Sequence, residues 1–154
     1  MIYPSNFESK IQFSEIRSLL KGYCLSQLGK DKVDAIAFGN DAELINTALR
    51  QTREFRRMQE ETDDFPLQYF FDMRASIKRI RIEGTHLEEN EIFDLRRSLD
   101  TIAGIVKFLN RSDDDGNFDY PTLHALTEDV LTFPDLIRRI DQILDKYGKI
   151  KDTA

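Results

Sequence analysis

Apolar residues recur at intervals of three and four along most of this sequence, and this spacing lines one face of an α-helix. Glycine and proline, the residues that interrupt helices, number only 7 and 4 among 154 residues. The pattern therefore predicts an all-α helical bundle. Since 40% of the residues are hydrophobic and 32% are charged, residues 1–154 are expected to form a single domain without disulfides or metals.

Two stretches carry the longest helical patterns. Residues 41–61 place seven residues on one broad arc, which we expect to be buried: Leu44, Ile45, Ala48, Leu49, Thr52, Phe55 and Met58. Residues 88–109 alternate apolar spacings of three and four, which predicts one long central helix of about 30 Å packed lengthwise on a partner. The residues of this second stripe are Ile92, Leu95, Leu99, Ile102, Val106 and Leu109.

Shorter helices are predicted from capping and proline signals. Ser14 and Ser26 are candidate N-caps near the start of the chain, and Thr85 with Glu88 matches a capping box before the long helix. Pro121 and Pro134 are favourable first-turn residues, and the apolar pattern after Pro134 continues through Tyr147 to Gly148. Pro66 ends the helix before it, and an aromatic cluster is expected to fill a junction between helices: Phe65, Tyr69, Phe70 and Phe71.

The residues needed for catalysis or metal binding are scarce. One cysteine and two distant histidines, His86 and His124, do not make a zinc site, and no phosphate-binding glycine loop is present. The acidic stretch 113–116 lacks the Asp and Glu that a calcium loop requires at its first and twelfth positions. The sequence therefore predicts no catalytic, cofactor-binding or metal-binding residue, and no enzyme activity in this chain itself.

Two basic stripes are candidate nucleic-acid contacts. The first lies on the helix within residues 41–61 and the second between Met73 and Ile82, where no acidic residue intervenes. Successive arginines and lysines at helical spacing can neutralise phosphates. Ordinary solvated faces paired with acidic neighbours are the favoured interpretation, because 28 acidic residues exceed 22 basic ones. The residues concerned are Arg50, Arg53, Arg57, Arg74, Lys78, Arg79 and Arg81.

The expected compartment is the cytoplasm. No apolar run approaches the roughly 20 residues that cross a bilayer, and the first residues do not have the pattern of a signal peptide. The single cysteine, Cys24, agrees with a reducing compartment. No membrane partner is expected.

Several segments, in order, resemble the start of the bacterial type-two MutS family. They are "MIYPSNFESKIQFSEIRSLL", Cys24-Leu25-Ser26 with Gly29-Lys30, "QTREFRRM", and "YFFDMRASIKRIRIEGTHLEENEIFDLRRSLDTIAGIVKFL". The ending "LDKYGKIKDTA" is similar to the family pattern D-x-x-G-x-[IV]-x-D-x-A-S, one residue short of its serine. The resemblance therefore implies the N-terminal piece of a longer protein.

What the resemblance implies divides between that longer protein and this segment. The family comprises ATP-hydrolysing dimers, using ATP and Mg²⁺, that engage branched DNA or stalled ribosomes and carry a C-terminal Smr endonuclease domain. Roles in DNA mismatch repair, recombination suppression and ribosome quality control follow. This segment would be the non-catalytic helical core from which lever helices rise towards the clamp. Two alternatives remain open: a nucleic-acid contact module using the basic stripes, and a helical protein-interaction or oligomerisation domain.

Overall fold

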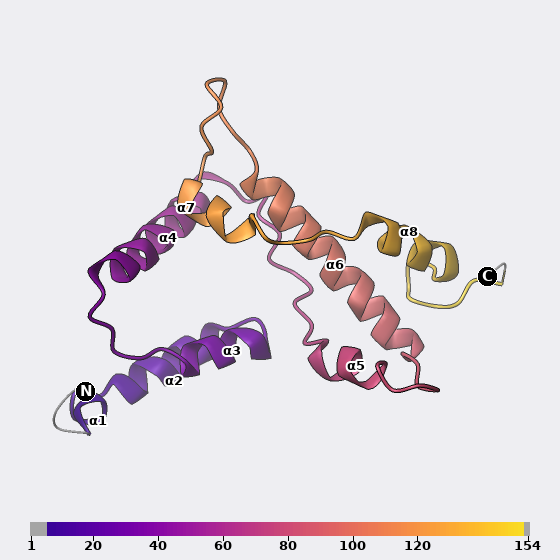
Figure 1. Cartoon of the computed structure of the whole chain (residues 1–154), viewed down its shortest axis with the longest axis horizontal. Coiled ribbons are helices and arrows are strands. Elements are labelled where there is room, and N and C mark those ends of the chain that lie inside the picture. Colours follow the sequence, from indigo (N-terminus) through magenta and orange to yellow (C-terminus); the bar gives the residue numbers. More distant parts are fainter. Residues whose placement is uncertain (1–5, 153–154) are drawn as a thin grey trace. The chain divides into compact units, whose positions relative to one another are not determined.

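The computed structural model describes residues 6–152, and over these residues the chain has eight α-helices, one 3₁₀ helix and no β-strand. The predicted all-α class is therefore confirmed (Figure 1). The sequence predicts one long central helix, but the structure has two helices of nearly equal length. They are α4, Ala42–Glu61, with 20 residues, and α6, Glu89–Leu109, with 21. None of the helices within residues 6–152 is both long enough and apolar enough to span a membrane.

The chain divides into two compact units, Met1–Phe38 and Gly39–Ala154. The first unit contains α1, Phe7–Lys10, α2, Phe13–Tyr23, and α3, Gln27–Asp34, and its α2 and α3 pack on each other. An ion pair of 2.7 Å joins Lys21 on α2 to Asp34 on α3. Ser26 caps α3 as predicted, accepting a hydrogen bond from the Gly29 N–H at 3.2 Å. Ser14 does not cap α2, because Gln12 occupies that position in a left-handed conformation.

The second unit continues from α4 and α6 with three shorter helical segments and a 3₁₀ turn. They are α5, Arg74–Arg79, α7, Pro121–His124, η1, Ala125–Thr127, and α8, Pro134–Ile143. Both predicted first-turn prolines stand at the start of their helices. The capping box of α6 is formed by Glu88 and Glu91, and the expected pair of Thr85 and Glu88 is wrong, because the Thr85 hydroxyl donates instead to the carbonyls of Arg79 and Ile82.

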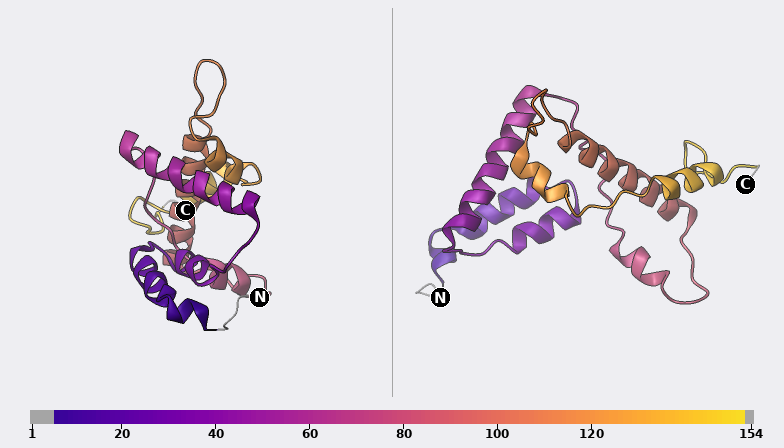
Figure 2. Two further views of the ribbon diagram at one scale, coloured as in Figure 1. Left: turned by 90° about the vertical axis from the view of Figure 1, so that its left-hand side faces the viewer. Right: turned by 45° about the horizontal axis from the view of Figure 1, so that its top comes forward.

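The ribbon of α7 lies beside that of α4 (Figure 2). A small core of buried side chains joins these two helices to α6. Its buried residues are Met58, Phe108, Leu109, Tyr120 and Leu123. The Phe65 ring contacts Phe55 of α4 and Phe108 of α6 edge-on, with centroid distances of 5.7 and 5.3 Å. Phe65 therefore fills a junction between two helices, as the sequence predicts.

Neither long helix buries the stripe that its sequence pattern indicates. On α4 only Met58 is buried, whereas Leu44, Ile45 and Leu49 are 69%, 43% and 49% exposed. On α6 the buried residues are Ser98, Thr101, Phe108 and Leu109. The expected burial is wrong for most of the α4 stripe, because α7 covers only part of that helix. The α6 stripe is half-buried, apart from the buried Leu109 and the exposed Ile102, and an extended segment, residues 66–71, rather than a helix, lies along the Ser98 and Thr101 side of α6.

The last helix also ends earlier than its apolar pattern predicts. The helix α8 stops at Ile143, and Leu144 forms an isolated antiparallel bridge with Ile150. Between them the Asp145 carboxylate accepts hydrogen bonds of 2.8 Å from the Tyr147 and Lys149 N–H groups. This side-chain pairing satisfies backbone donors that a helix would otherwise use, so residues 145–149 form a turn.

Candidate functional site

Buried hydroxyl groups on α6 hold the extended segment 66–71. The Thr101 hydroxyl donates to the Gln68 carbonyl at 2.8 Å, and the Ser98 hydroxyl donates to the Tyr69 carbonyl at 3.3 Å. These two bonds attach the backbone of residues 68 and 69 to α6. Gly104 extends the same side of α6, where an added Cβ would lie 3.4 Å from the Pro66 ring. Sequence reasoning missed these residues; two hydroxyls on one helical face are their only signal.

Next to these hydroxyls, Arg97 of α6 is enclosed by aromatic rings. Its guanidinium lies 4.8 Å from the Tyr69 ring centroid, 4.5 Å from that of Phe71 and 4.5 Å from that of Phe93. Its charge is paired with Asp94 at 2.5 Å. A cation over several ring faces is attracted by their quadrupoles, so Arg97 joins the segment 66–71 to the first half of α6.

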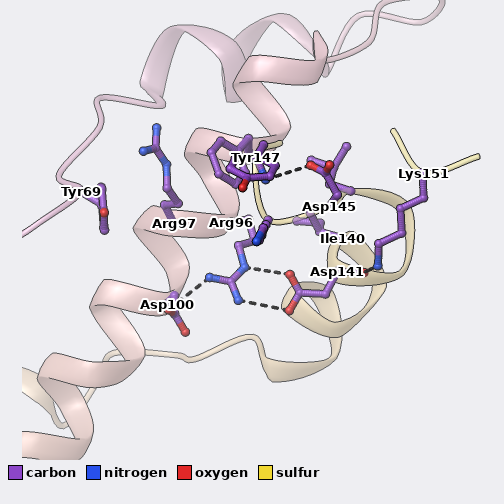
Figure 3. A pocket seen from close by; sticks show the side chains of 12 residues that line it. Tyr69, Arg96, Arg97, Asp100, Ile140, Asp141, Asp145, Tyr147 and Lys151 are labelled. Atoms are coloured by element: carbon purple, nitrogen blue, oxygen red, sulfur yellow. Dashed lines mark hydrogen bonds and ion pairs between the residues drawn. The ribbon is translucent and has the colours of Figure 1, made fainter. Parts of the chain in front are cut away.

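A second arginine of α6 holds α8 (Figure 3). Arg96 donates two hydrogen bonds to the Asp141 carboxylate, at 2.8 and 3.2 Å, and a third to Asp100 at 3.2 Å. The hydrogen bond to Asp141 is the main cause of a raised pKa for Arg96. Planar, two-point pairing of this kind fixes orientation as well as distance.

The turn after α8 is attached to the beginning of α6. The Glu89 carboxylate accepts the Ile150 N–H at 2.8 Å and the Lys149 ammonium at 3.0 Å. The bond from the Ile150 N–H, followed by that from Lys149, lowers the pKa of Glu89. At Gly148 the backbone has φ +79, and a Cβ there would come within 2.6 Å of the Phe93 ring. We call residues 145–150 the C-terminal turn.

A cavity of about 880 Å³ lies between α6, α8 and the C-terminal turn. Figure 3 shows Arg96 paired with Asp141 and Asp100 in this cavity. Lys151 donates to the Asp141 carbonyl at 2.6 Å, so it is also engaged. The lining contains no histidine, cysteine, serine or threonine, so it does not form a Ser–His or Cys–His pair. The hydrogen bonds around the cavity attach α8 and the C-terminal turn to α6.

The first basic stripe is partly used within the fold. Arg57 donates to the Asp119 carbonyl, lies 4.9 Å from the Tyr120 ring centroid and is 3.6 Å from Glu61. Arg50 donates to the Thr47 hydroxyl at 3.1 Å. Arg53 is exposed, and no hydrogen bond or ion pair joins its side chain to any of residues 6–152.

The second basic stripe divides in the same way. Arg79 bonds to Glu91, and Arg74 is paired with Asp72 at 2.6 Å. Lys78 and Arg81 are exposed, and their side chains have no hydrogen bond or ion pair within the part of the chain that the structure describes. Phosphate contact by either stripe stays a prediction, with Arg53, Lys78 and Arg81 as its most available side chains.

His124 and the acidic loop are held by contacts within the fold, whereas His86 is exposed and lies 3.6 Å from Glu88. The His124 ring stacks on Phe118 with a centroid distance of 3.5 Å and hydrogen-bonds Asn110 at 3.0 Å. In the acidic loop, the Asp113 carboxylate accepts the Asn117 N–H at 2.8 Å, which is the main cause of its lowered pKa. Residues 6–152 contain no group of three or more side chains that could hold a metal ion.

Similarity to known proteins extends over nearly the whole chain. This chain is 27% identical to "Endonuclease MutS2" of Latilactobacillus sakei over 94% of this chain's length. It is also 27% identical to the protein of that name from Listeria innocua, over 96% of this chain's length. The same name belongs to a Geobacillus relative that is 26% identical over 94% of this chain. The resemblance to the type-two MutS family is confirmed.

The similarity covers nearly all of this chain but only a small part of each relative. The chain spans only 18% of the length of each of these MutS2 relatives. No family model matches the sequence, and no solved structure matches it significantly. The name "endonuclease" therefore describes relatives that are much longer than this chain.

Proposed function

We propose that this chain is the non-catalytic helical core and lever segment of a MutS2-type protein. In this role it links an ATPase elsewhere in the protein to a clamp that engages branched DNA or stalled ribosomes. The process served would be DNA repair, suppression of recombination or ribosome rescue, and it would take place in the cytoplasm, where both targets occur. ATP, Mg²⁺ and the endonuclease activity would belong to other parts of the protein, as would the surfaces of its homodimer.

The observation that supports a lever is the attachment of α6 at both ends. Its last turn contributes Phe108 and Leu109 to the core shared with α4 and α7. Its first turns hold the C-terminal turn through Glu89 and Phe93. A helix of 21 residues extends about 30 Å, so a displacement at one attachment is carried to the other by a stiff element.

The first test of the proposal is translation of the gene beyond codon 154. We expect a serine next and a G-x-x-x-x-G-K-[ST] loop downstream. In the resulting longer protein, Gly148→Ala should detach the C-terminal turn from α6. It should leave basal ATP hydrolysis unchanged and reduce the stimulation of hydrolysis by branched DNA or ribosomes. Gly116→Ala, a substitution at a similar φ in an open loop, serves as the control.

Two outcomes would sink the lever proposal. A stop codon directly after Ala154 would leave no ATPase to couple. Unchanged stimulation in a Gly148→Ala protein whose turn is demonstrably displaced would show that this attachment transmits nothing. The displacement is measured separately, as the loss of hydrogen-exchange protection at the Ile150 amide, which donates to Glu89.

The exposed basic side chains favour one second candidate, a nucleic-acid contact module. The side chains of Arg53, Lys78 and Arg81 lack partners within residues 6–152, whereas those of the other members of the stripes are engaged. If they contact phosphates, the affinity of the chain for DNA or RNA falls steeply with salt. Replacing Arg53 by Gln then lowers the log–log salt slope by about 1. Fluorescence anisotropy over a salt series measures the slope, and binding that is absent or insensitive to salt excludes this candidate.

A further inference from the structure

Two neighbouring cavities form one groove along α6. The first is the cavity of about 880 Å³ beside α8, and the second, of about 520 Å³, lies between α6 and residues 65–69. Tyr69 and Asp100 line both cavities, so the two are adjacent, and both lie within the unit Gly39–Ala154. We call them together the α6 groove. Its floor is one face of the helix, because residues at alternating spacings of four and three line it: Phe93, Arg97, Asp100, Gly104 and Lys107.

One wall of the α6 groove offers amide groups that the fold does not use. The carbonyls of Gln68 and Tyr69 accept hydrogen bonds from α6. Within residues 6–152, by contrast, the N–H and C=O of Leu67 and the side-chain amide of Gln68 have no hydrogen bond, and both residues are exposed. Tyr69 has φ +64, so the regular extension ends before it. Unused N–H and C=O groups on an extended segment can pair with a second extended peptide.

Positive charge is left over in the α6 groove. Five basic and three acidic residues line the two cavities, although acidic residues are in excess in the whole chain. The three acids and both arginines are bonded within the fold. Lys107 and Lys146 are exposed, and neither ammonium group has a hydrogen bond or ion pair with any of residues 6–152. Each lysine lines a different cavity, so the two unpaired charges belong to different parts of the groove.

We propose that the α6 groove binds an extended peptide segment of a partner protein, with apolar side chains between two carboxylates. The carboxylates pair with Lys107 and Lys146, the apolar side chains pack on Tyr69 and Phe93, and the peptide backbone bonds to Leu67. This role is separate from that of a lever. The occupant is a peptide rather than a nucleic-acid strand, because the wall presents amides and because three carboxylates in the lining repel phosphates.

The length of the groove sets the length of the peptide. From Phe93 to Lys107, α6 rises about 21 Å at 1.5 Å per residue. An extended peptide spans this distance with about seven residues, and its alternate side chains point to the same side. A segment of the form E-S-L-S-F-S-E therefore directs both carboxylates and both apolar side chains towards the groove.

Fluorescence anisotropy of the 154-residue chain with this labelled heptapeptide, acetylated and amidated at its ends, tests the proposal. It should bind with a Kd of about 100 μM, because the contact is smaller than the roughly 1,200 Å² of stable complexes. K-S-L-S-F-S-K and E-S-S-S-S-S-E should each bind at least about tenfold more weakly, since one lacks the carboxylates and the other the apolar side chains. Equal binding of the three peptides, or no saturable binding of the first up to about 1 mM, overturns the proposal.

Charge reversal tests the two lysines. Lys107→Glu and Lys146→Glu should each weaken binding of E-S-L-S-F-S-E at least about threefold, and the double variant should prefer K-S-L-S-F-S-K. Lys78→Glu is the matched control: Lys78 is an exposed lysine outside both cavities, so this variant should bind as the wild type does. Equal weakening by all three reversals would show attraction by net charge alone and would overturn the site.

Amide chemical shifts in NMR spectra locate the bound peptide. Titration with E-S-L-S-F-S-E should shift the amides of Leu67, Gln68 and Gly104, which line the groove. Shifts confined to other parts of the chain overturn the proposed site. A single-stranded DNA heptamer is the competing occupant. If it shifts the same amides and displaces the peptide, the groove is a nucleic-acid site and the assignment to a peptide is wrong.

Discussion

Gly148→Ala is the substitution that most directly probes the attachment of the C-terminal turn to α6. Gly148 has φ +79, a conformation that costs an L-residue about 1–2 kcal/mol. The new Cβ would also lie 2.6 Å from Cγ and 3.0 Å from Cβ of Phe93, the part of that side chain nearest the α6 backbone. The position of the Phe93 Cβ is set by the α6 backbone, so rotation of the ring alone does not relieve the 3.0 Å contact. Overpacking of this kind costs about 1–3 kcal/mol more.

The assay for this prediction is urea unfolding followed by far-UV circular dichroism, with Gly116→Ala as the control. Gly116 has φ +82, but a Cβ there would meet nothing within 4 Å, so this variant should lose only the backbone part, about 1–2 kcal/mol. The difference between the variants measures the contact with Phe93. It should be about 1–3 kcal/mol, or roughly 3–10 °C in Tm.

A local response to Gly148→Ala is also measurable. If the turn leaves α6 instead of straining it, the amide of Ile150 loses the hydrogen bond to Glu89 and its exchange with solvent accelerates. Equal destabilisation by Gly148→Ala and Gly116→Ala, together with unchanged exchange at Ile150, would refute the close packing of the turn on Phe93.

Three further predictions concern other attachments. Glu54→Gln should cost about 1 kcal/mol in urea unfolding, because the charge facing the first N–H groups of α7 is lost, whereas Glu60→Gln on the exposed face should change little. Thr101→Val should cost about 1–2 kcal/mol by leaving a backbone carbonyl without its donor, and a loss near zero would contradict that role. The Arg79 guanidinium, then Ser76 and the Glu88 N–H, lower the pKa of Glu91 from 4.5 to about 2. The contribution of the ionised Glu91 to stability is therefore complete above pH 4.5 and is lost as the pH falls towards 2. Glu91→Gln should flatten this part of the profile of urea midpoint against pH. An unchanged slope would exclude the interaction.

The helices themselves were predictable because their signals are local. Ser26, Pro121 and Pro134 mark the starts of α3, α7 and α8 in the sequence and in the structure. A cap or a first-turn proline acts within one turn of the helix, so neighbouring residues are enough to identify it. The errors at Ser14 and Thr85 arose where another residue a few positions away took the capping position.

The candidate site was mostly beyond prediction. Nothing near Ser98 and Thr101 in the sequence distinguishes them from other helix residues. Only the fold places the carbonyls of residues 68 and 69 next to their hydroxyl groups. Likewise, the sequence shows the basic stripes but does not show which of their arginines are bonded within the fold and which are exposed without a side-chain partner. Arg57 is engaged because Asp119 and Tyr120, about sixty residues later, lie against α4.

The sequence by itself determined the all-α class, most helix boundaries and the resemblance to type-two MutS proteins, because helical periodicity and capping depend on residues within a few positions of one another. Only the tertiary structure decided which faces of α4 and α6 are covered, where α8 gives way to a turn, and which charges are paired. An apolar stripe requires a partner surface but does not specify one. The position of that partner depends on chain segments distant in sequence, and on α4 it leaves Leu44, Ile45 and Leu49 exposed.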